Sequence, residues 1–263
     1  MQSTRIFNPS VIFQSIPDIL SYLDVTILVA LSSIVLGSLF GMILAWGKNS
    51  RHWLPRLAAN GYTYVMRCTP SIVLLFIVFY GLPRILEETL GYDIDESHRA
   101  VFAIITFTML FAAYISEVFR ASYQAVAKGQ YEAVVSIGLS PFQAFRTVLL
   151  PQAAVIALPN FSNSVINLFK EGALAYTIGL IDMLGRGNLI IAQNFGAYGV
   201  EIYLACMLIY WVLTTLIGKA FYVLEVHMNK TRLNGAVSSN KSGVRLGLLR
   251  NRTPFVKYLQ HED

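Results

Sequence analysis

Polar side chains recur along one otherwise apolar stretch near residues 151–171. They are spaced three or four residues apart and comprise Asn160, Asn163, Ser164, Asn167 and Glu171. On a helix this spacing places them on one face. Amide, hydroxyl and carboxylate groups there could hydrogen-bond a polar solute that crosses apolar surroundings. A second interpretation is that Asn and Ser only bond neighbouring membrane helices to one another.

Charged residues inside apolar stretches are further candidates, because an unpaired charge in a bilayer is costly. Lys170 could attract a substrate carboxylate, or it could pair with Glu171 or another acid. Glu117 could contact a substrate, or it could pair with Arg120, which follows three residues later on the same predicted helix.

No catalytic triad or metal-binding cluster accompanies these residues. The histidines are scattered among loops, and Cys68 and Cys206 each lie alone in an apolar segment. Isolated cysteines of this kind fit a packing role better than a disulfide or a metal site. No glycine run forms a phosphate-binding loop, so we do not expect the chain to hydrolyse ATP alone. Nucleic-acid binding has no support beyond a basic C-terminus.

The composition indicates an all-α membrane protein. The 263 residues are 55% hydrophobic and 13% charged, with a mean hydropathy of +0.56. Soluble domains carry roughly 25% charged residues. Long apolar stretches between the charges predict five transmembrane helices, at about residues 25–47, 60–82, 99–122, 151–169 and 201–223. Helices are expected because lipid offers the backbone polar groups no other partner.

The connecting segments predict the topology. Going along the chain they are basic, acidic, basic, nearly neutral and basic. Since basic loops stay in the cytoplasm, the N-terminus should lie outside and the C-terminus inside. We therefore divide the chain into an extracytoplasmic segment (1–23), a transmembrane domain (24–226) and a basic cytoplasmic tail (227–263), for which a disordered state is the simplest expectation. Residues 172–181 should form a short re-entrant or surface helix outside.

The segment between the third and fourth spans is predicted to form short cytoplasmic helices. Glu132 suits the positive end of a helix, and Gly138 should break the run. Ser140 can then cap a second, amphipathic helix, with Pro141 in its first turn.

This segment resembles the EAA loop of importer-type ABC permeases. The matching residues are Glu132-Ala133-Val134, Gly138, Val148 and Leu150-Pro151, with Val134 and Val148 replacing the usual alanine and isoleucine. The neighbourhood is similar to polar amino acid permeases over about residues 21–226. The shared stretches are Y-T-Y-V-M-R-C-T-P from Tyr62, K-G-Q-Y-E from Lys128 and L-P-Q-A from Leu150. Arg67 lies in the first and, by its family position, should brace the second span.

The resemblance implies a type I importer fold, with the transmembrane helices joined by a cytoplasmic coupling loop. It implies that the ATPase-coupling residues are Glu132, Ala133, Ser136, Ile137, Gly138 and Leu139. Together with the polar stripe, it implies that the substrate-binding residues are Asn160, Asn163, Asn167, Lys170, Glu171, Gly172, Ala173, Leu174 and Glu117. At one point the sequence departs from the family: Glu171-Gly172-Ala173 replaces the usual aspartate, threonine and serine, which removes two hydroxyl groups.

The function implied is the permease subunit of an ATP-driven amino acid importer in the bacterial inner membrane. The chain would not be an enzyme by itself and would hold no cofactor or metal. ATP and Mg would bind two partner ATPase subunits. A second permease subunit, an extracytoplasmic amino acid-binding protein and the lipid bilayer complete the expected partners. The alternative is an ion-coupled secondary amino acid transporter that uses Glu117, although five spans without an internal repeat do not favour it.

Overall fold

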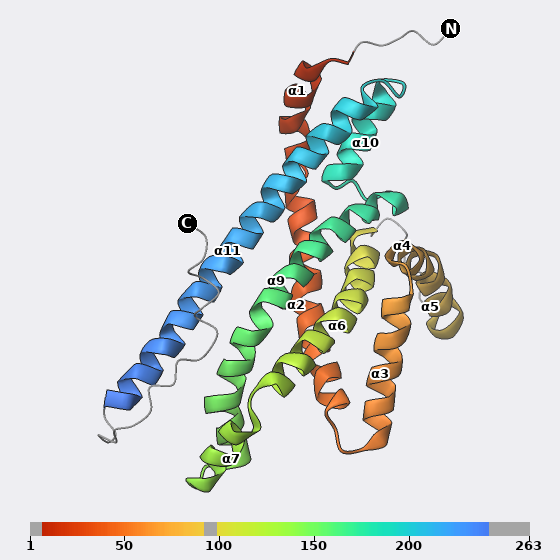
Figure 1. Ribbon diagram of the computed structural model, residues 1–263. Coiled ribbons are helices and arrows are strands. Elements are labelled where there is room, and N and C mark those ends of the chain that lie inside the picture. The colour runs from red at the N-terminus through yellow and green to blue at the C-terminus, as the bar shows by residue number, and fades with distance from the viewer. Residues whose placement is uncertain (1–6, 92–98, 242–263) are drawn as a thin grey trace. The chain divides into compact units, whose positions relative to one another are not determined.

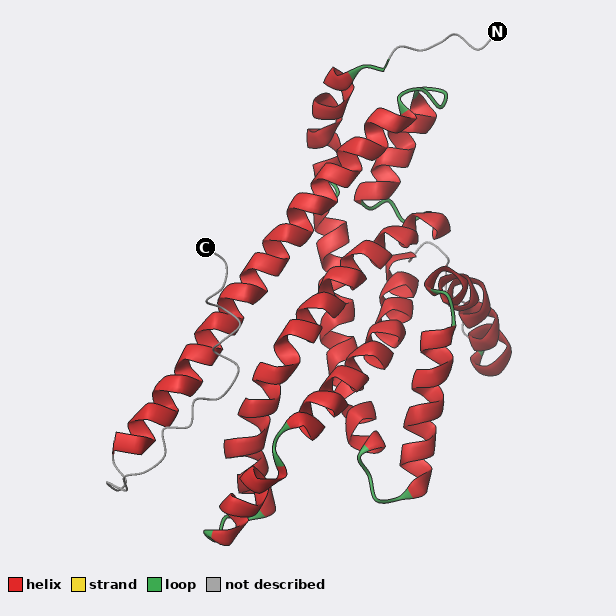
Figure 2. Cartoon of the chain, in the orientation of Figure 1, coloured by secondary structure: helices red, strands yellow, loops and turns green. Residues whose placement is uncertain are grey.

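The structure is a computed structural model that describes residues 7–91 and 99–241. Every regular element within these residues is a helix (Figure 2). Four helical segments of the described chain are long and apolar enough to cross a membrane, or five if one sharply bent pair counts as a span. The predicted all-α membrane fold is therefore confirmed.

The first half of the chain contains α1 (Pro9–Leu20), α2 (Leu23–Lys48), α3 (Trp53–Cys68), α4 (Ser71–Phe76), the π-helical turn η1 (Ile77–Gly81), α5 (Leu82–Leu90) and α6 (Arg99–Ala125). The second half contains α7 (Lys128–Ser136), α8 (Pro141–Ala144), the π-helical turn η2 (Phe145–Leu149), α9 (Leu150–Gly172), the 3-10 helix η3 (Ala173–Ile178), α10 (Met183–Gln193) and α11 (Gly199–Lys241).

The centre of the fold is the pair formed by α2 and α6, with α9 alongside (Figure 1). Glycines on α2 let the two backbones approach closely. A Cβ added to Gly37 would lie 2.9 Å from the Phe111 ring of α6, and one added to Gly41 would overlap Ile115. Such small-residue contacts are a common way of packing helices in lipid. Phe107 and Leu168, both buried, extend the same core across α6 and α9.

The second predicted span, 60–82, is wrong as a single straight helix. The chain bends by 106° between α3 and the α4–α5 segment. The break lies at Thr69, whose φ of −91° and ψ of 128° are extended. Thr69 precedes Pro70, and a proline ring disfavours helical geometry in the residue before it. The extended geometry of Thr69 therefore ends α3 and lets α4 leave in a new direction.

The fourth predicted span is longer than expected. Helical structure is continuous from Pro141 through Gly172, so the predicted second cytoplasmic helix is the beginning of this span rather than a separate element. Pro151 lacks an N–H and its ring would crowd the preceding turn of a regular α-helix. The π-helical turn η2 immediately precedes it and provides a wider turn at that point.

Two short helices, α1 and α10, have no counterpart among the predicted spans. Asn8 caps α1 and Pro9 occupies its first turn, while Asp182 caps α10 by accepting a hydrogen bond of 2.7 Å from Gly185 N–H. Arg186 of α10 pairs with Asp18 of α1 at 2.7 Å. In Figure 1 this pair of helices lies at the opposite end from α7. The short helix expected within 172–181 is confirmed as η3.

The chain divides into two compact units, Met1–Glu225 and Val226–Asp263. Helix α11 continues to Lys241, so the first part of the segment predicted as a tail is helical. Once a helix is nucleated, each added residue gains a backbone hydrogen bond, which is why α11 extends past its apolar part. The rest of the predicted tail, residues 242–263, lies outside the described residues.

Candidate functional site

The loop between α6 and α9 is built around a sharp reversal at Gly138. This residue has a φ of +88°, in the left-handed region that glycine adopts without strain. Its N–H bonds the Val135 carbonyl at 3.0 Å, and the Leu139 N–H bonds the Val134 carbonyl at 3.2 Å. These two bonds close the C-terminus of α7 as a Schellman motif. The predicted break at Gly138 is confirmed.

The next helix begins as its sequence predicts. Ser140 Oγ accepts from Gln143 N–H at 3.3 Å, while Gln143 Oε1 accepts from Ser140 N–H at 2.9 Å. This is a capping box. Together with the Schellman motif, it fixes the turn from both sides without help from another part of the chain.

The residues predicted for coupling lie together on this loop, and most of them are exposed. Glu132, Ala133, Ser136 and Gly138 are exposed and Leu139 is half-buried. Ile137 is 74% exposed at the tip, and Phe142, which sequence reasoning did not include among the coupling residues, is 70% exposed. Large apolar side chains at such a tip contribute little to the stability of this chain and are typical of a protein-binding surface.

A groove of about 720 Å³ runs beside α7. Tyr123 and Gln124 from the end of α6, Tyr131 and Glu132 from α7, and Phe145 from η2 contribute to its walls. The loop therefore offers two surfaces, an apolar tip and a mixed groove that contains the Glu132 carboxylate.

The polar stripe of α9 lies on the surface of this chain. Asn160, Asn163, Asn167 and Lys170 are exposed, whereas Ser164 is half-buried and donates to the Asn160 carbonyl at 2.9 Å. Within residues 7–91 and 99–241, none of the three asparagine side chains has a hydrogen-bond partner. An uncovered amide row on a membrane helix requires water or another polypeptide beside it.

At the end of the stripe, Glu171, Gly172, Ala173 and Leu174 are half-buried where α9 tightens into η3. Arg67 lies against α6: its guanidinium is 5.8 Å from the centre of the Tyr114 ring, within cation–π range. This contact joins the end of α3 to α6 and agrees with the predicted bracing role of Arg67. Tyr114 is not among the residues that the sequence predicted for the site.

Glu117, predicted as a possible substrate contact, is engaged by other residues of this chain. One carboxylate oxygen accepts from Lys48 Nζ at 2.6 Å, and the other accepts from Arg120 Nη2 at 2.7 Å. The pairing with Arg120 that its spacing allowed is confirmed. The sequence does not predict the contact with Lys48, because no local signal connects residues that are 69 positions apart. Among the described residues, no hydrogen bond joins the Glu117 carboxylate to Asn160, Asn163 or Asn167; its hydrogen-bond partners are Lys48 and Arg120.

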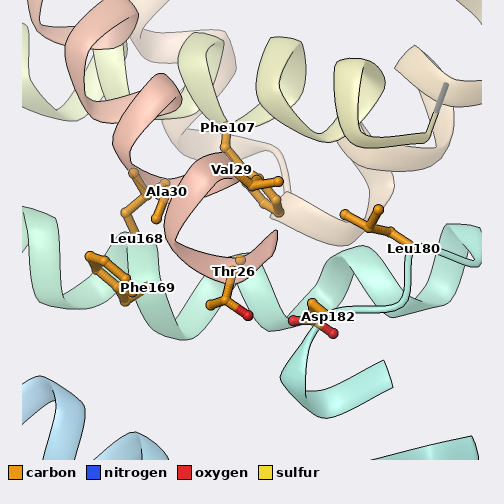
Figure 3. Close-up of a pocket in the computed structure, with 9 residues that line it drawn as sticks. Thr26, Val29, Ala30, Phe107, Leu168, Phe169, Leu180 and Asp182 are labelled. Carbon is orange, nitrogen blue, oxygen red and sulfur yellow. The ribbon is translucent and has the colours of Figure 1, made fainter. Parts of the chain in front are cut away.

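A second buried polar group, Asp182, lies where η3, α10 and α2 meet. A small cavity of about 10 Å³ adjoins it, lined also by Thr26, Val29, Phe107 and Leu168 (Figure 3). Asp182 is 2% exposed, and this burial raises the pKa of its carboxyl to about 6, although the Gly185 N–H bond opposes the rise. Thr26 Oγ1 accepts from Met183 N–H at 3.3 Å. These contacts secure the start of α10 against α2.

Among the residues that the structure describes, no cluster of histidine, cysteine and acidic side chains could hold a metal ion. The site therefore offers exposed hydrogen-bonding groups along α9 and an exposed apolar tip at the α7–α8 loop.

Residues 37–230 match the model of the family described as binding-protein-dependent transport system inner membrane component. The L-cystine transport system permease protein TcyL of Bacillus subtilis is 36% identical over 231 residues, which cover 87% of this chain and 95% of the relative. The histidine/lysine/arginine/ornithine transport system permease protein HisQ of Salmonella typhimurium is 33% identical over 76% of this chain and 89% of its own.

Two solved structures of ABC transporters superpose on this chain. An amino acid ABC transporter crystallised with histidines superposes with a TM-score of 0.73 at 27% identity, covering 85% of this chain and all of that chain. The MetNI methionine ABC transporter in an inward-facing form gives a TM-score of 0.57 at 18% identity, a likeness of fold alone.

Proposed function

This chain belongs to the family of binding-protein-dependent transport system inner membrane components, and from that premise we propose that it is the permease subunit of an ATP-driven amino acid importer. The cargo class is supported by relatives named for the transport of cystine and of histidine, lysine, arginine and ornithine. The chain would form the translocation path in the bacterial inner membrane and would not be an enzyme by itself.

The observation that carries the proposal is the loop at Gly138, with its Schellman motif, its capping box and its exposed apolar tip. We propose that this loop is cytoplasmic and docks on one of two partner ATPase subunits, which would bind the ATP and Mg. Ile137 would enter the partner surface, and Glu132 is available for a basic group of the partner. Since the turn is fixed by its own hydrogen bonds, a displacement of the ATPase would move the loop as one body.

The exposed row of asparagines supports the rest of the proposal. A second permease subunit, either another copy or a different chain, would cover α9 and enclose the polar row between the two subunits. Asn160, Asn163 and Asn167 would then bond the substrate's polar ends. Lys170 would attract the carboxylate and Glu171 the ammonium group, and the backbone of Gly172, Ala173 and Leu174 would close the site at the end of α9. Glu117, also a predicted substrate contact, is paired with Lys48 and Arg120 in this structure, so we propose the asparagine row rather than Glu117 as the main substrate surface.

The direction of transport requires the topology that the loop charges predict, with the N-terminus outside. The end of the chain that carries α1 and α10 would then face an extracytoplasmic amino acid-binding protein, and the α7–α8 loop would face the ATPases.

The test is Gly138→Asp in the complete transporter, reconstituted in liposomes with its ATPase and binding protein. A side chain at a φ of +88° strains the turn, and a carboxylate would be placed next to Ile137. We expect wild type to hydrolyse ATP faster when loaded binding protein is present, and the variant to lose this stimulation and its ATPase subunit on purification.

Gly91→Asp is a matched control. Gly91 has a φ of +63°, and nothing lies within 4 Å of a Cβ added there, as at Gly138, but it follows α5 rather than α7. It should keep normal stimulation. If Gly138→Asp keeps its ATPase and uptake instead follows an ion gradient, the chain is a secondary transporter and the proposal is wrong.

A further inference from the structure

We propose that a ring of polar side chains at the ends of α2 and α6 is a positioning element that sets the direction of the last turns of α6, and through them the position of the coupling loop. The ring consists of Lys48, Asn49, Glu117, Arg120 and Gln124. This inference rests on the proposed function, because it concerns how the loop is held in the transporter.

The ring is a continuous set of hydrogen bonds between the two helices. Lys48 Nζ donates to Glu117 at 2.6 Å and to Ser116 Oγ at 2.8 Å. Arg120 donates to the other Glu117 oxygen through Nε at 2.9 Å and to Gln124 Oε1 through Nη1 at 2.8 Å. Gln124 Nε2 then donates to Asn49 Oδ1 at 3.1 Å, which brings the path back to the residue after Lys48.

Helix adhesion does not explain this ring. The Lys48 side chain is 1% exposed, and removing an ammonium group from water is costly even when it is paired. Along the rest of their length α2 and α6 are already held by close contacts at Gly37 and Gly41. An apolar pair at the position of Lys48 and Glu117 would hold the helices as well or better. What ionic and hydrogen-bonded groups add is a defined geometry, because each bond is directional.

The geometry of the ring matters because the ring reaches the groove beside α7. Gln124, its last member, lies in the wall of the groove beside α7, together with Tyr123 and Glu132. Helix α7 begins at Lys128, only four residues after Gln124, and between them Val126 is buried against Leu149 and Ala153. A change in direction at the end of α6 would therefore shift the root of the coupling loop relative to α9.

The experiment compares Lys48→Met and Asn49→Ala in the complete transporter. Methionine keeps an unbranched side chain only one heavy atom shorter and removes the ammonium. Asn49→Ala removes the bond from Gln124 to Asn49 at an exposed position and leaves every charge of the ring in place. It therefore still tests the ring if Lys48→Met fails to fold. Arg186→Gln is the control, since it breaks an ion pair of similar length, 2.7 Å against 2.6 Å for Lys48–Glu117, at the other end of the fold.

We expect both ring variants to assemble with the ATPase and to keep the basal rate of hydrolysis. Stimulation by loaded binding protein should fall about tenfold in Lys48→Met, within the usual range of coupling between sites, and less in Asn49→Ala. Lys48→Arg should restore part of it. Amide hydrogen exchange in residues 120–127 should rise in both ring variants and remain unchanged in Arg186→Gln.

Unchanged stimulation together with unchanged exchange in residues 120–127 would overturn the positioning role. Basal and stimulated rates that fall in equal proportion, with loss of assembly in both ring variants, would also overturn it, because they indicate a purely structural contribution. Failure of the proposed function has a different signature: wild type itself would show no stimulation by binding protein, while the exchange measurement would still report on the ring.

Discussion

The close approach of α2 and α6 can be tested by adding one methyl group, in Gly37→Ala. The new Cβ would lie 2.9 Å from Phe111 Cδ1, 3.1 Å from Phe111 Cβ and 3.1 Å from the Thr108 carbonyl oxygen. Ordinary van der Waals contact begins several tenths of an ångström further out. Two of these three atoms belong to the α6 backbone or are attached directly to it, so rotation of a side chain cannot remove the overlap.

The magnitude follows from these contacts. Overpacking a tight site typically costs about 1–3 kcal/mol, and alanine regains up to about 1 kcal/mol through its higher helix propensity. Taking the middle of the first range, about 2 kcal/mol, and the full gain in propensity, about 1 kcal/mol, the net loss of stability for Gly37→Ala should be about 1 kcal/mol. Gly61→Ala on α3 is the control: nothing lies within 4 Å of the added Cβ, so only the gain in propensity applies.

The chain contains its own reporter for this measurement. Cys206 is 3% exposed, whereas Cys68 is exposed. In a Cys68→Ala background, a thiol-reactive dye added during slow heating in detergent should report the loss of structure around Cys206. Gly37→Ala should react at a lower temperature than the parent, and Gly61→Ala at the same temperature or a higher one. An equal or higher transition for Gly37→Ala would refute the close packing of α2 on α6.

Two further predictions concern Asp182, which the same assay can test, and Ser140, which hydrogen exchange can test. Because burial raises the pKa of Asp182 to about 6 from 3.8, the folded state binds the proton more tightly than the unfolded state does, and stability should fall as the pH rises from about 4 through 6. The shift corresponds to about 3 kcal/mol of stability. Asp182→Asn should remove this dependence of stability on pH. If the stability of wild type and variant changed with pH in the same way, the assigned burial of Asp182 would be contradicted. Ser140→Ala removes the hydrogen bond from Gln143 N–H to Ser140 Oγ, one of the two bonds of the capping box. It should lower the stability of this helix start by about 1 kcal/mol, which would be detected as faster hydrogen exchange in residues 140–145 of the variant. An identical exchange rate in the two proteins would show that the cap contributes nothing.

The elements predicted well from sequence are those whose signals are local. Long uncharged stretches predicted α2, α6, α9 and the membrane part of α11, and Gly138 and Ser140 predicted the turn between α7 and α8. The bend at Thr69 had a local signal too, the following proline, but the continuous apolar character of residues 60–82 dominated the interpretation. Helices α1 and α10 are short and lie in segments outside the predicted spans, α1 before the first span and α10 between the fourth and fifth, although Asn8-Pro9 is a recognisable helix start.

The contacts within the site depended on distances along the chain that a single sequence does not reveal. Glu117 and Arg120 are three residues apart, and their pairing followed from helix geometry. Lys48 is 69 residues from Glu117, and Asp18 is 168 residues from Arg186. Neither ion pair can be predicted from composition or from hydrophobic periodicity. The exposure of Asn160, Asn163 and Asn167 could not be predicted either, because periodicity identifies residues on one face of a helix but not what that face contacts.

The continuity of the helix from Pro141 to Gly172 changes how the proposed transporter would couple its two sites. With a separate amphipathic helix, as the sequence suggested, movement of the coupling loop would reach the polar row through a flexible joint. A continuous helix of this length instead spans roughly 45 Å at 1.5 Å per residue, with the coupling tip at one end and Lys170 and Glu171 at the other. Its weakest points are the π-helical turn η2 and Pro159, where regular hydrogen bonding is interrupted. A tilt imposed at the loop would then reach Asn160, Asn163 and Asn167 through one continuous helix. Bending of that helix would be concentrated at η2 and Pro159.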